Sequence, residues 1–203
     1  MRYKSKNYFI DALKAETLAK KYSTPLYCYS FKKLRNNIIN FKKSFKPINP
    51  IICFAVKANS NKAILREIGR LGLGADVVSL GELIAALRSG IKTNKIVFSG
   101  VGKTEDELKY AIKKKILLIN AESENEIRTI EKIAKKEKRI VDIGIRINPN
   151  TDAKTLNQIS TGKKENKFGV SEEVFSNLFN YIKRSKNLNL KCLSVHIGSQ
   201  ILD

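Results

Sequence analysis

Short apolar runs alternate with amphipathic stretches along most of this chain, and no other feature of the sequence restricts the fold as strongly. Six runs have the length and composition of buried strands: 51–57, 74–80, 95–100, 115–120, 141–148 and 190–198. Helical patterns lie between them, over 61–72, 81–90, 104–114, 122–137 and 171–185. Strand–helix alternation at this pace favours a parallel α/β sheet or barrel.

The two faces of the predicted strands favour a barrel over an open sheet. In the run 141–148 one face is wholly apolar, whereas the other carries Asp142 and Arg146. The run 190–198 repeats this pattern, with His196 on its polar face. Polar groups near the C-terminal mouth of a barrel interior fit the pattern. An eight-unit barrel needs about 250 residues, so the six units here predict an incomplete (β/α)8 TIM barrel.

The first part of the chain has a different pattern. It predicts a helix over 11–22, a short strand within 24–30, and a basic amphipathic helix over 31–45 that ends before a proline. We therefore expect an N-terminal segment over 1–46 and the partial barrel over 47–203. The helix starts further along carry capping signals: Thr104 is followed three residues later by Glu107, and Ser171 precedes two glutamates.

The formal net charge of +20 raises the possibility of a nucleic-acid partner, because basic chains bind phosphates through counterion release. The excess consists of 30 Lys against 9 Arg and is spread over the whole chain. Specific phosphate and base recognition uses the Arg fork instead. Ile and Asn are also abundant, and Lys, Ile and Asn share A/T-rich codons. We interpret the charge as compositional background and expect no nucleic-acid partner.

The remaining composition argues against a membrane, a secretory route and a metal centre. No apolar run approaches the roughly 18–20 residues that cross a bilayer, and acidic residues precede any hydrophobic stretch at the N-terminus. Cys28, Cys53 and Cys192 are far apart in a chain with one histidine, which disfavours a zinc site or a disulfide framework. We expect a cytoplasmic protein with no membrane partner and no metal.

Four polar residues lie at or near the C-terminal ends of predicted strands, where parallel barrels hold their reactive groups. Lys57 is either a partly desolvated Schiff-base lysine or one of many lysines that extend to solvent. His196 either stacks on a planar cofactor and moves protons or is a hydrogen-bonded core histidine. Arg146 needs an anion, which is either a ligand or a structural carboxylate such as Asp142 or another in the barrel. Asp76 is the remaining candidate.

Seven motifs occur in one order along the chain: TPLYCYS (24–30), FAVKAN (54–59), GADVVSLGEL (74–83), RINPN (146–150), ISTG (159–162), KFGV (167–170) and SVHIGSQ (194–200). In that order they closely resemble the PLP-dependent decarboxylases with an alanine-racemase-like barrel, and in particular their diaminopimelate branch. The resemblance implies a pyridoxal 5′-phosphate cofactor, an amino-acid substrate, and decarboxylation of meso-2,6-diaminopimelate to L-lysine. It also implies a homodimer in the full-length form.

The resemblance also implies roles for five residues. Lys57 matches the lysine that binds PLP as a Schiff base, and His196 matches the histidine that stacks on the pyridine ring. Asp76 matches an aspartate near that lysine, Arg146 an arginine near the cofactor, and Ser199 a residue close to the phosphate. PLP supplies the electron sink in such enzymes, while the protein orients the scissile bond.

The sequence departs from the family pattern in three respects. Leu80 stands where the motif usually has Gly, and Leu156 stands where a His often precedes ISTG. The family pattern continues with a Gly-rich phosphate-binding segment, an E-P-G-R motif and a C-terminal β-domain, whereas this sequence ends at Asp203. We therefore expect the 203-residue chain alone to be inactive.

Other functions stay open at this point. The substrate can be ornithine, arginine or carboxynorspermidine, because the specificity residues of the family lie mostly in the part beyond residue 203. A non-catalytic PLP-binding remnant is a further reading, and a basic nucleic-acid binder is the most distant one.

Overall fold

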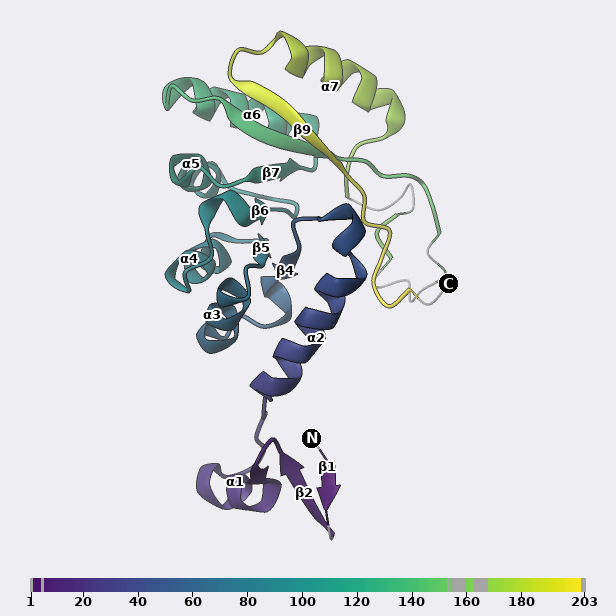
Figure 1. The fold of residues 1–203 in the computed structure, drawn as a ribbon. Coiled ribbons are helices and arrows are strands. Elements are labelled where there is room, and N and C mark those ends of the chain that lie inside the picture. The colour runs from purple at the N-terminus through teal and green to yellow at the C-terminus, as the bar shows by residue number, and fades with distance from the viewer. Residues whose placement is uncertain (1, 5, 153, 155–159, 163–167, 202–203) are drawn as a thin grey trace. The chain divides into compact units, whose positions relative to one another are not determined.

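The computed structural model of the chain describes residues 2–4, 6–152, 154, 160–162 and 168–201. The chain divides into two compact units, Met1–Pro50 and Ile51–Asp203 (Figure 1). The division lies a few residues beyond the one expected from sequence, which placed it after residue 46.

The second unit is one parallel sheet whose six strands lie side by side in chain order. The strands are β4 (Cys53–Ala55), β5 (Gly74–Val77), β6 (Ile96–Phe98), β7 (Leu118–Ala121), β8 (Val141–Arg146) and β9 (Leu188–Ser194). The helices between them are α3 (Lys62–Arg70), α4 (Leu80–Arg88), α5 (Glu105–Lys114), α6 (Glu124–Lys136) and α7 (Glu172–Arg184). Two 3₁₀ turns, η2 (Val56–Ala58) and η3 (Thr93–Lys95), complete the connections. This confirms the predicted parallel sheet of six strands that alternate with helices.

The connecting helices begin at capping residues, as the sequence predicts. Thr104 and Glu107 form a capping box, in which each side chain accepts a hydrogen bond from the other residue's backbone N–H. The side chains of Ser79, Ser123 and Ser171 cap α4, α6 and α7 in the simpler way, by accepting one backbone N–H of the first turn. These caps fix the points where the chain leaves the sheet.

The core lies between the sheet and the helices, which in Figure 1 line one side of β4–β6 as α3, α4 and α5. Ile143 and Ile145 of β8 are fully buried in it, as are Ile127 and Ile130 of α6. The alternate positions of β8 include Arg146, which lines a cavity on the other side. The predicted division of this strand into an apolar face and a polar face is therefore confirmed.

The first unit contains a small antiparallel sheet that the sequence did not indicate. Its strands are β1 (Arg2–Lys4), β2 (Asn7–Ile10) and β3 (Leu13–Lys14), followed by α1 (Ala15–Tyr22), α2 (Phe31–Ser44) and the 3₁₀ turn η1 (Lys46–Ile48). The predicted helix over 11–22 is wrong in its first turn, because Asp11 has a left-handed φ of 54° in the turn from β2 to β3. The predicted helix over 31–45 is confirmed.

The predicted strand within 24–30 is wrong. A strand needs the backbone groups of a neighbour, and no strand among the described residues pairs with this stretch. Leu26, Tyr27 and Tyr29 give the stretch the apolar composition of a strand. All three side chains are nevertheless exposed.

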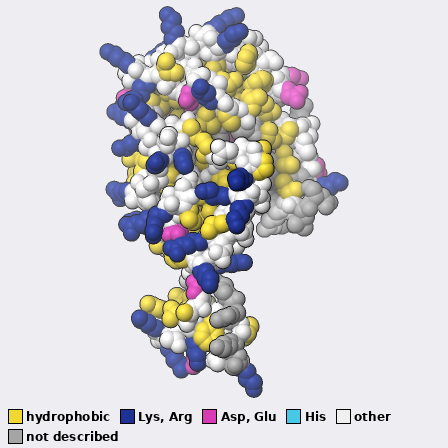
Figure 2. Space-filling view, in the orientation of Figure 1, with side chains coloured by type: hydrophobic (Ala, Val, Ile, Leu, Met, Phe, Trp, Pro, Cys, Tyr) yellow, Lys and Arg dark blue, Asp and Glu magenta, His cyan; other side chains and the backbone are white. Residues whose placement is uncertain are grey.

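Lysine and arginine side chains are distributed across the visible face rather than gathered in one patch (Figure 2). Within the described part of the chain, no helix combines the length and the apolar composition that a membrane span requires.

Candidate functional site

A cavity of about 550 Å³ opens at the carboxyl ends of the six strands. Its volume falls within the range of small-molecule sites, and the carboxyl end of a parallel sheet is where such sites form. Every strand contributes a lining residue: Cys53, Asp76, Val97, Asn120, Arg146 and Ser194. A second cavity of about 700 Å³ lies at the opposite ends of β7 and β8, among apolar side chains and lysines. We place the candidate site in the first cavity, because the polar residues of several strands converge there.

Four of the five predicted site residues meet in this cavity: Lys57, Asp76, Arg146 and His196. Ser199 is not among the described residues that line it. The sequence therefore identified the cavity from residues up to 139 positions apart. Their roles stay predictions.

Two of these residues sit differently from the prediction. Lys57 does not end a strand, because β4 stops at Ala55 and the chain turns into η2. Its side chain is exposed, which agrees with the alternative of a lysine that extends to solvent. His196 lies two residues beyond the end of β9 rather than within a strand. Both residues are therefore held by turns and loops at the rim of the sheet.

Asp76 is joined to its neighbours by a chain of hydrogen bonds across three strands. The Ser99 hydroxyl donates to Asp76 Oδ1 at 2.6 Å, and Asn120 Nδ2 donates to Ser99 Oγ at 3.1 Å. Burial raises the pKa of Asp76, while the Ser99 hydrogen bond and the Lys57 charge oppose that rise. The carboxyl is thus fixed in place and retains a proton at higher pH than an exposed aspartate does.

Arg146 is paired with a carboxylate, but not with Asp142. Its guanidinium contacts both oxygens of Glu122, at 3.1 and 3.3 Å. It also lies over the ring of Phe168 and donates to the His196 carbonyl at 3.2 Å. Asp142 instead accepts a hydrogen bond from Asn189. The alternative that another barrel carboxylate pairs with Arg146 is therefore correct.

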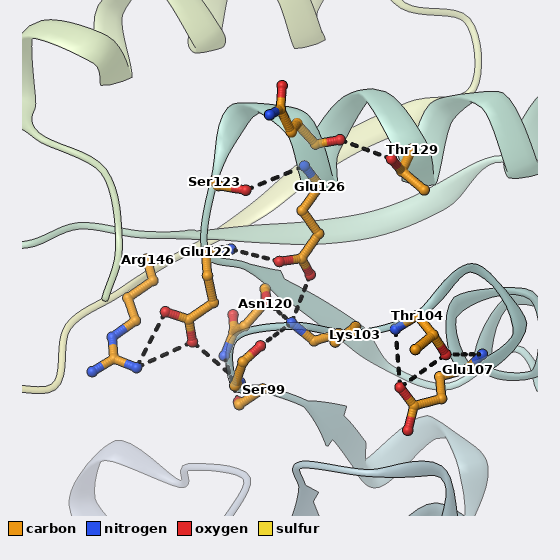
Figure 3. Close-up of polar contacts among 12 residues, drawn as sticks. Ser99, Lys103, Thr104, Glu107, Asn120, Glu122, Ser123, Glu126, Thr129 and Arg146 are labelled. Carbon is orange, nitrogen blue, oxygen red and sulfur yellow. Dashed lines mark hydrogen bonds and ion pairs between the residues drawn. The ribbon is translucent and has the colours of Figure 1, made fainter. Parts of the chain in front are cut away.

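Lys103 joins the loop after β6 to β7 and to α6 (Figure 3). Its side chain is 1% exposed. Its ammonium group donates to the carbonyls of Gly100 and Asn120, at 2.6 and 2.8 Å, and to Glu126 Oε1 at 2.6 Å. All three N–H groups of the lysine are thus used.

Glu126 continues this connection to the Arg146 pair. Its second carboxylate oxygen accepts the backbone N–H of Glu122 at 3.2 Å. Glu122 in turn accepts the backbone N–H of Gly100 at 3.1 Å while it holds Arg146. Burial raises the pKa of Glu126, and the Lys103 charge opposes the rise. The network therefore links the ends of β6, β7 and β8.

His196 is the titratable ring of the site. Burial lowers its pKa below the ordinary 6.5, and the positive charges of Arg146 and Lys57 act in the same direction. Its Nδ1 atom lies 2.9 Å from the Thr161 hydroxyl oxygen. The ring is thus held at the cavity, and its neutral form is favoured over the protonated one.

Cys53 in the cavity wall is not arranged as a nucleophile. Burial raises the pKa of its thiol to about 11, and the Asp76 charge contributes to the rise. Because the thiolate is the reactive form, the raised pKa leaves little reactive Cys53 near neutral pH.

Sequence reasoning did not single out several residues of this site: Ser99, Lys103, Asn120, Glu122, Thr161 and Phe168. Ser99 lies one residue before the end of the predicted strand 95–100 and Asn120 ends the predicted strand 115–120, so their position alone could have indicated them. Thr161 and Phe168 fall within quoted motifs, but nothing local in the sequence shows what they touch. Leu156, the departure before ISTG, lies outside the described residues; Leu80 is the first residue of α4.

Comparison with known proteins identifies the family. Residues 31–203 match the family model for the pyridoxal-dependent decarboxylases, specifically their pyridoxal binding domain. The chain belongs to this decarboxylase family. It is 50% identical over 188 residues to the diaminopimelate decarboxylase of Helicobacter pylori strain J99, which covers 93% of this chain and 46% of that protein. It is 40% identical over all 203 residues to that of Aquifex aeolicus, of which it covers 48%.

Solved decarboxylase structures share the fold. Diaminopimelate decarboxylase from Helicobacter pylori in complex with L-lysine superimposes with a TM-score of 0.90 at 48% identity, over 93% of this chain and 48% of that one. The diaminopimelate decarboxylase from M. jannaschii superimposes with a TM-score of 0.92 at 37% identity, over 100% of this chain and 48% of that one. The chain thus spans about half the length of the decarboxylases that it matches.

The residues of the cavity fit a pyridoxal group. Two buried polar atoms in its wall, Asn120 Oδ1 and Ser194 Oγ, have no hydrogen-bond partner among the described residues. Buried polar atoms without partners are costly, and a polar ligand would relieve that cost. The cavity also offers the Lys57 amine, which can bind an aldehyde, and the His196 imidazole.

Proposed function

We propose that the protein is a PLP-dependent decarboxylase that converts meso-2,6-diaminopimelate to L-lysine and carbon dioxide. The observation that most supports this function is the convergence of Lys57, Asp76 and His196 in one cavity. The chain that forms the cavity is 50% identical over 188 residues to the diaminopimelate decarboxylase of Helicobacter pylori strain J99.

Lys57, Asp76 and His196 would hold the cofactor. The exposed amine of Lys57 is accessible to an aldehyde at the rim of the cavity. When bound, pyridoxal phosphate withdraws electrons from the substrate α-carbon, which lets the carboxylate depart as carbon dioxide. The His196 ring would pack against a flat ligand, and the Asp76 carboxyl, fixed by Ser99, would hold or accept a proton at its side.

Arg146 would supply a positive charge at a fixed position. Both of its contacts with Glu122 and its contact with the His196 carbonyl limit the movement of the guanidinium. Preorganised charges stabilise a reaction at low cost because they do not reorient during it. The pairing with Glu122 also reduces the net charge that the group presents to a ligand.

The first experiment tests cofactor binding. Pyridoxal phosphate is added to the protein, the cofactor absorbance band is recorded, and borohydride is used to fix the cofactor before peptide mass analysis. We expect the label on Lys57, and its loss in Lys57→Ala. Lys62→Ala, which changes an exposed lysine at the start of α3, is the matched control and should retain the label. A label distributed over other lysines would contradict the assignment.

The second experiment tests the substrate. Lysine formation from meso-2,6-diaminopimelate is measured with the polypeptide as its gene encodes it, beside ornithine and arginine as competing substrates. Preference for either competitor would overturn the diaminopimelate assignment and leave the decarboxylase assignment intact.

We also expect a cytoplasmic homodimer. Light scattering of the purified protein is the direct test of the oligomeric state.

A further inference from the structure

Thr161 is anchored opposite His196 by backbone contacts. It belongs to residues 160–162, between β8 and α7. Its N–H donates to the carbonyl of Ile197 at 3.0 Å, and the adjacent Ser160 forms an antiparallel bridge with Gly198. The Thr161 side chain therefore starts from a backbone position that is fixed relative to the residues after β9.

Gly162 allows this close approach. A Cβ atom at Gly162 would lie 2.7 Å from the Thr151 carbonyl oxygen and 3.1 Å from Ile197 Cα. The Thr151 N–H also donates to the Gly162 carbonyl at 2.8 Å. Glycine is thus required for residues 160–162 to lie this close to Thr151 and Ile197, and this close approach lets Thr161 reach His196.

Two contacts join the Thr161 hydroxyl to His196. Thr161 Oγ1 lies 2.6 Å from the His196 carbonyl oxygen and 2.9 Å from His196 Nδ1. Two oxygens 2.6 Å apart require a proton between them, and a carbonyl has none to give. The single hydroxyl proton of Thr161 therefore points at the carbonyl. The proton in the second contact must then come from Nδ1.

We propose that Thr161 is a positioning residue, which orients the His196 ring and fixes its neutral form as the Nδ1–H tautomer. Nε2 is then the unprotonated ring nitrogen. The bond that one imidazole nitrogen makes decides the protonation of the other. The charged groups that act on the ring are Arg146, Lys57 and Asp76. Arg146 donates to the same carbonyl as Thr161 does, so it does not compete for Nδ1.

The relevance of this tautomer to catalysis rests on the proposed function. A ring held by Thr161 presents one fixed face to a flat ligand in the cavity that it shares with Lys57. The tautomer itself does not depend on the cofactor, so it can be measured with the protein alone.

His196 is the single histidine of the 203 residues, so one imidazole gives the whole signal. The experiment labels the protein with ¹⁵N-histidine and uses NMR to determine which ring nitrogen carries the proton, at a pH where the ring is neutral. We expect the proton on Nδ1. A proton on Nε2 in the unmodified protein would overturn the proposal without the need for any variant.

Three variants separate positioning from general stability. Thr161→Val keeps the shape but removes the hydroxyl, and should lower the ratio of Nδ1–H to Nε2–H about fivefold, the factor of one typical hydrogen bond. Thr161→Ser keeps the hydroxyl and should retain the original ratio. Ser160→Ala is the matched control, because the buried Ser160 hydroxyl has no hydrogen-bond partner among the described residues. An unchanged ratio in Thr161→Val would contradict the proposal.

The borohydride label on Lys57 distinguishes this proposal from the proposed function. Thr161→Val leaves Lys57 unchanged and should still be labelled, but with weaker affinity for pyridoxal phosphate. If the original protein takes no label while its tautomer is Nδ1–H, the cofactor proposal fails and the Thr161 proposal stands. If the original protein takes the label and its ring proton is on Nε2, the Thr161 proposal fails and the cofactor proposal stands.

Discussion

Glu122 holds Arg146 through both of its carboxylate oxygens, at 3.1 and 3.3 Å, and the two side chains are only 2% and 12% exposed. A buried ion pair of this kind is not by itself a source of stability, but breaking it is costly because one charge is left unpaired. The pair therefore identifies a position where a small chemical change should have a large effect.

Glu122→Gln should destabilise the protein by about 3 kcal/mol, because the Arg146 charge then lacks its carboxylate. Urea unfolding followed by circular dichroism measures the change. Lys132→Ala is the control: this lysine pairs with Glu105 at the surface, where both side chains are more than half exposed, and should cost less than about 1 kcal/mol. Equal effects of the two changes would show that the Glu122 pair is no stronger than a surface pair.

Lys103→Met should also cost about 3 kcal/mol or more, since it leaves Glu126 buried without its cation and three acceptors without their donor. The double variant Lys103→Met/Glu126→Gln should recover part of the loss, because no charge is then left unpaired. Unfolding of the four proteins of this cycle gives the interaction energy. A double variant as unstable as the sum of the single ones would argue against direct coupling.

The lowered pKa of His196 makes stability depend on pH. Between that lowered value and 6.5 the unfolded chain binds the proton more readily than the native protein does. The free energy of unfolding should therefore rise with pH across this window and fall as the pH drops through it. Urea unfolding over a pH series should show this slope, and His196→Gln should reduce it. Identical slopes in the two proteins would show that other groups cause the dependence.

Cys53 should react slowly with alkylating reagents. A thiol pKa of about 11 in place of 9.0 leaves about a hundredfold less thiolate near neutral pH. Asp76→Asn removes a charge that raises this pKa, so it should speed the alkylation of Cys53. The pKa of Cys192 is raised by burial alone, and its rate should not change. Mass analysis of the alkylated peptides measures both rates.

Periodicity predicted the sheet because its six strands and five helices bury one face each, and burial leaves a pattern in the sequence. Thr104 and Ser171 marked helix starts because capping depends on residues only three positions apart. These features are local, and the structure confirms them.

The errors arose where local alternation and composition do not decide the structure. Lys57 continues the alternation of its strand, yet β4 ends at Ala55 because the chain turns into η2. The stretch 24–30 has the composition of a strand but no described partner strand. Glu122 could not be matched to Arg146 from sequence, since many carboxylates of the barrel were equally eligible.

The agreement between strand order and chain order also has a consequence for how the protein folds. Cys53 pairs with Gly74, and Ala75 with Ile96, so most strands join a neighbour made shortly before. Such local pairing favours growth of the sheet strand by strand as the chain is synthesised. The pairing of Val141 with Leu188 spans the longest connection. We therefore expect β9 to join after the other five strands, so that Ser194 and His196 reach the cavity later than Lys57 and Asp76 do.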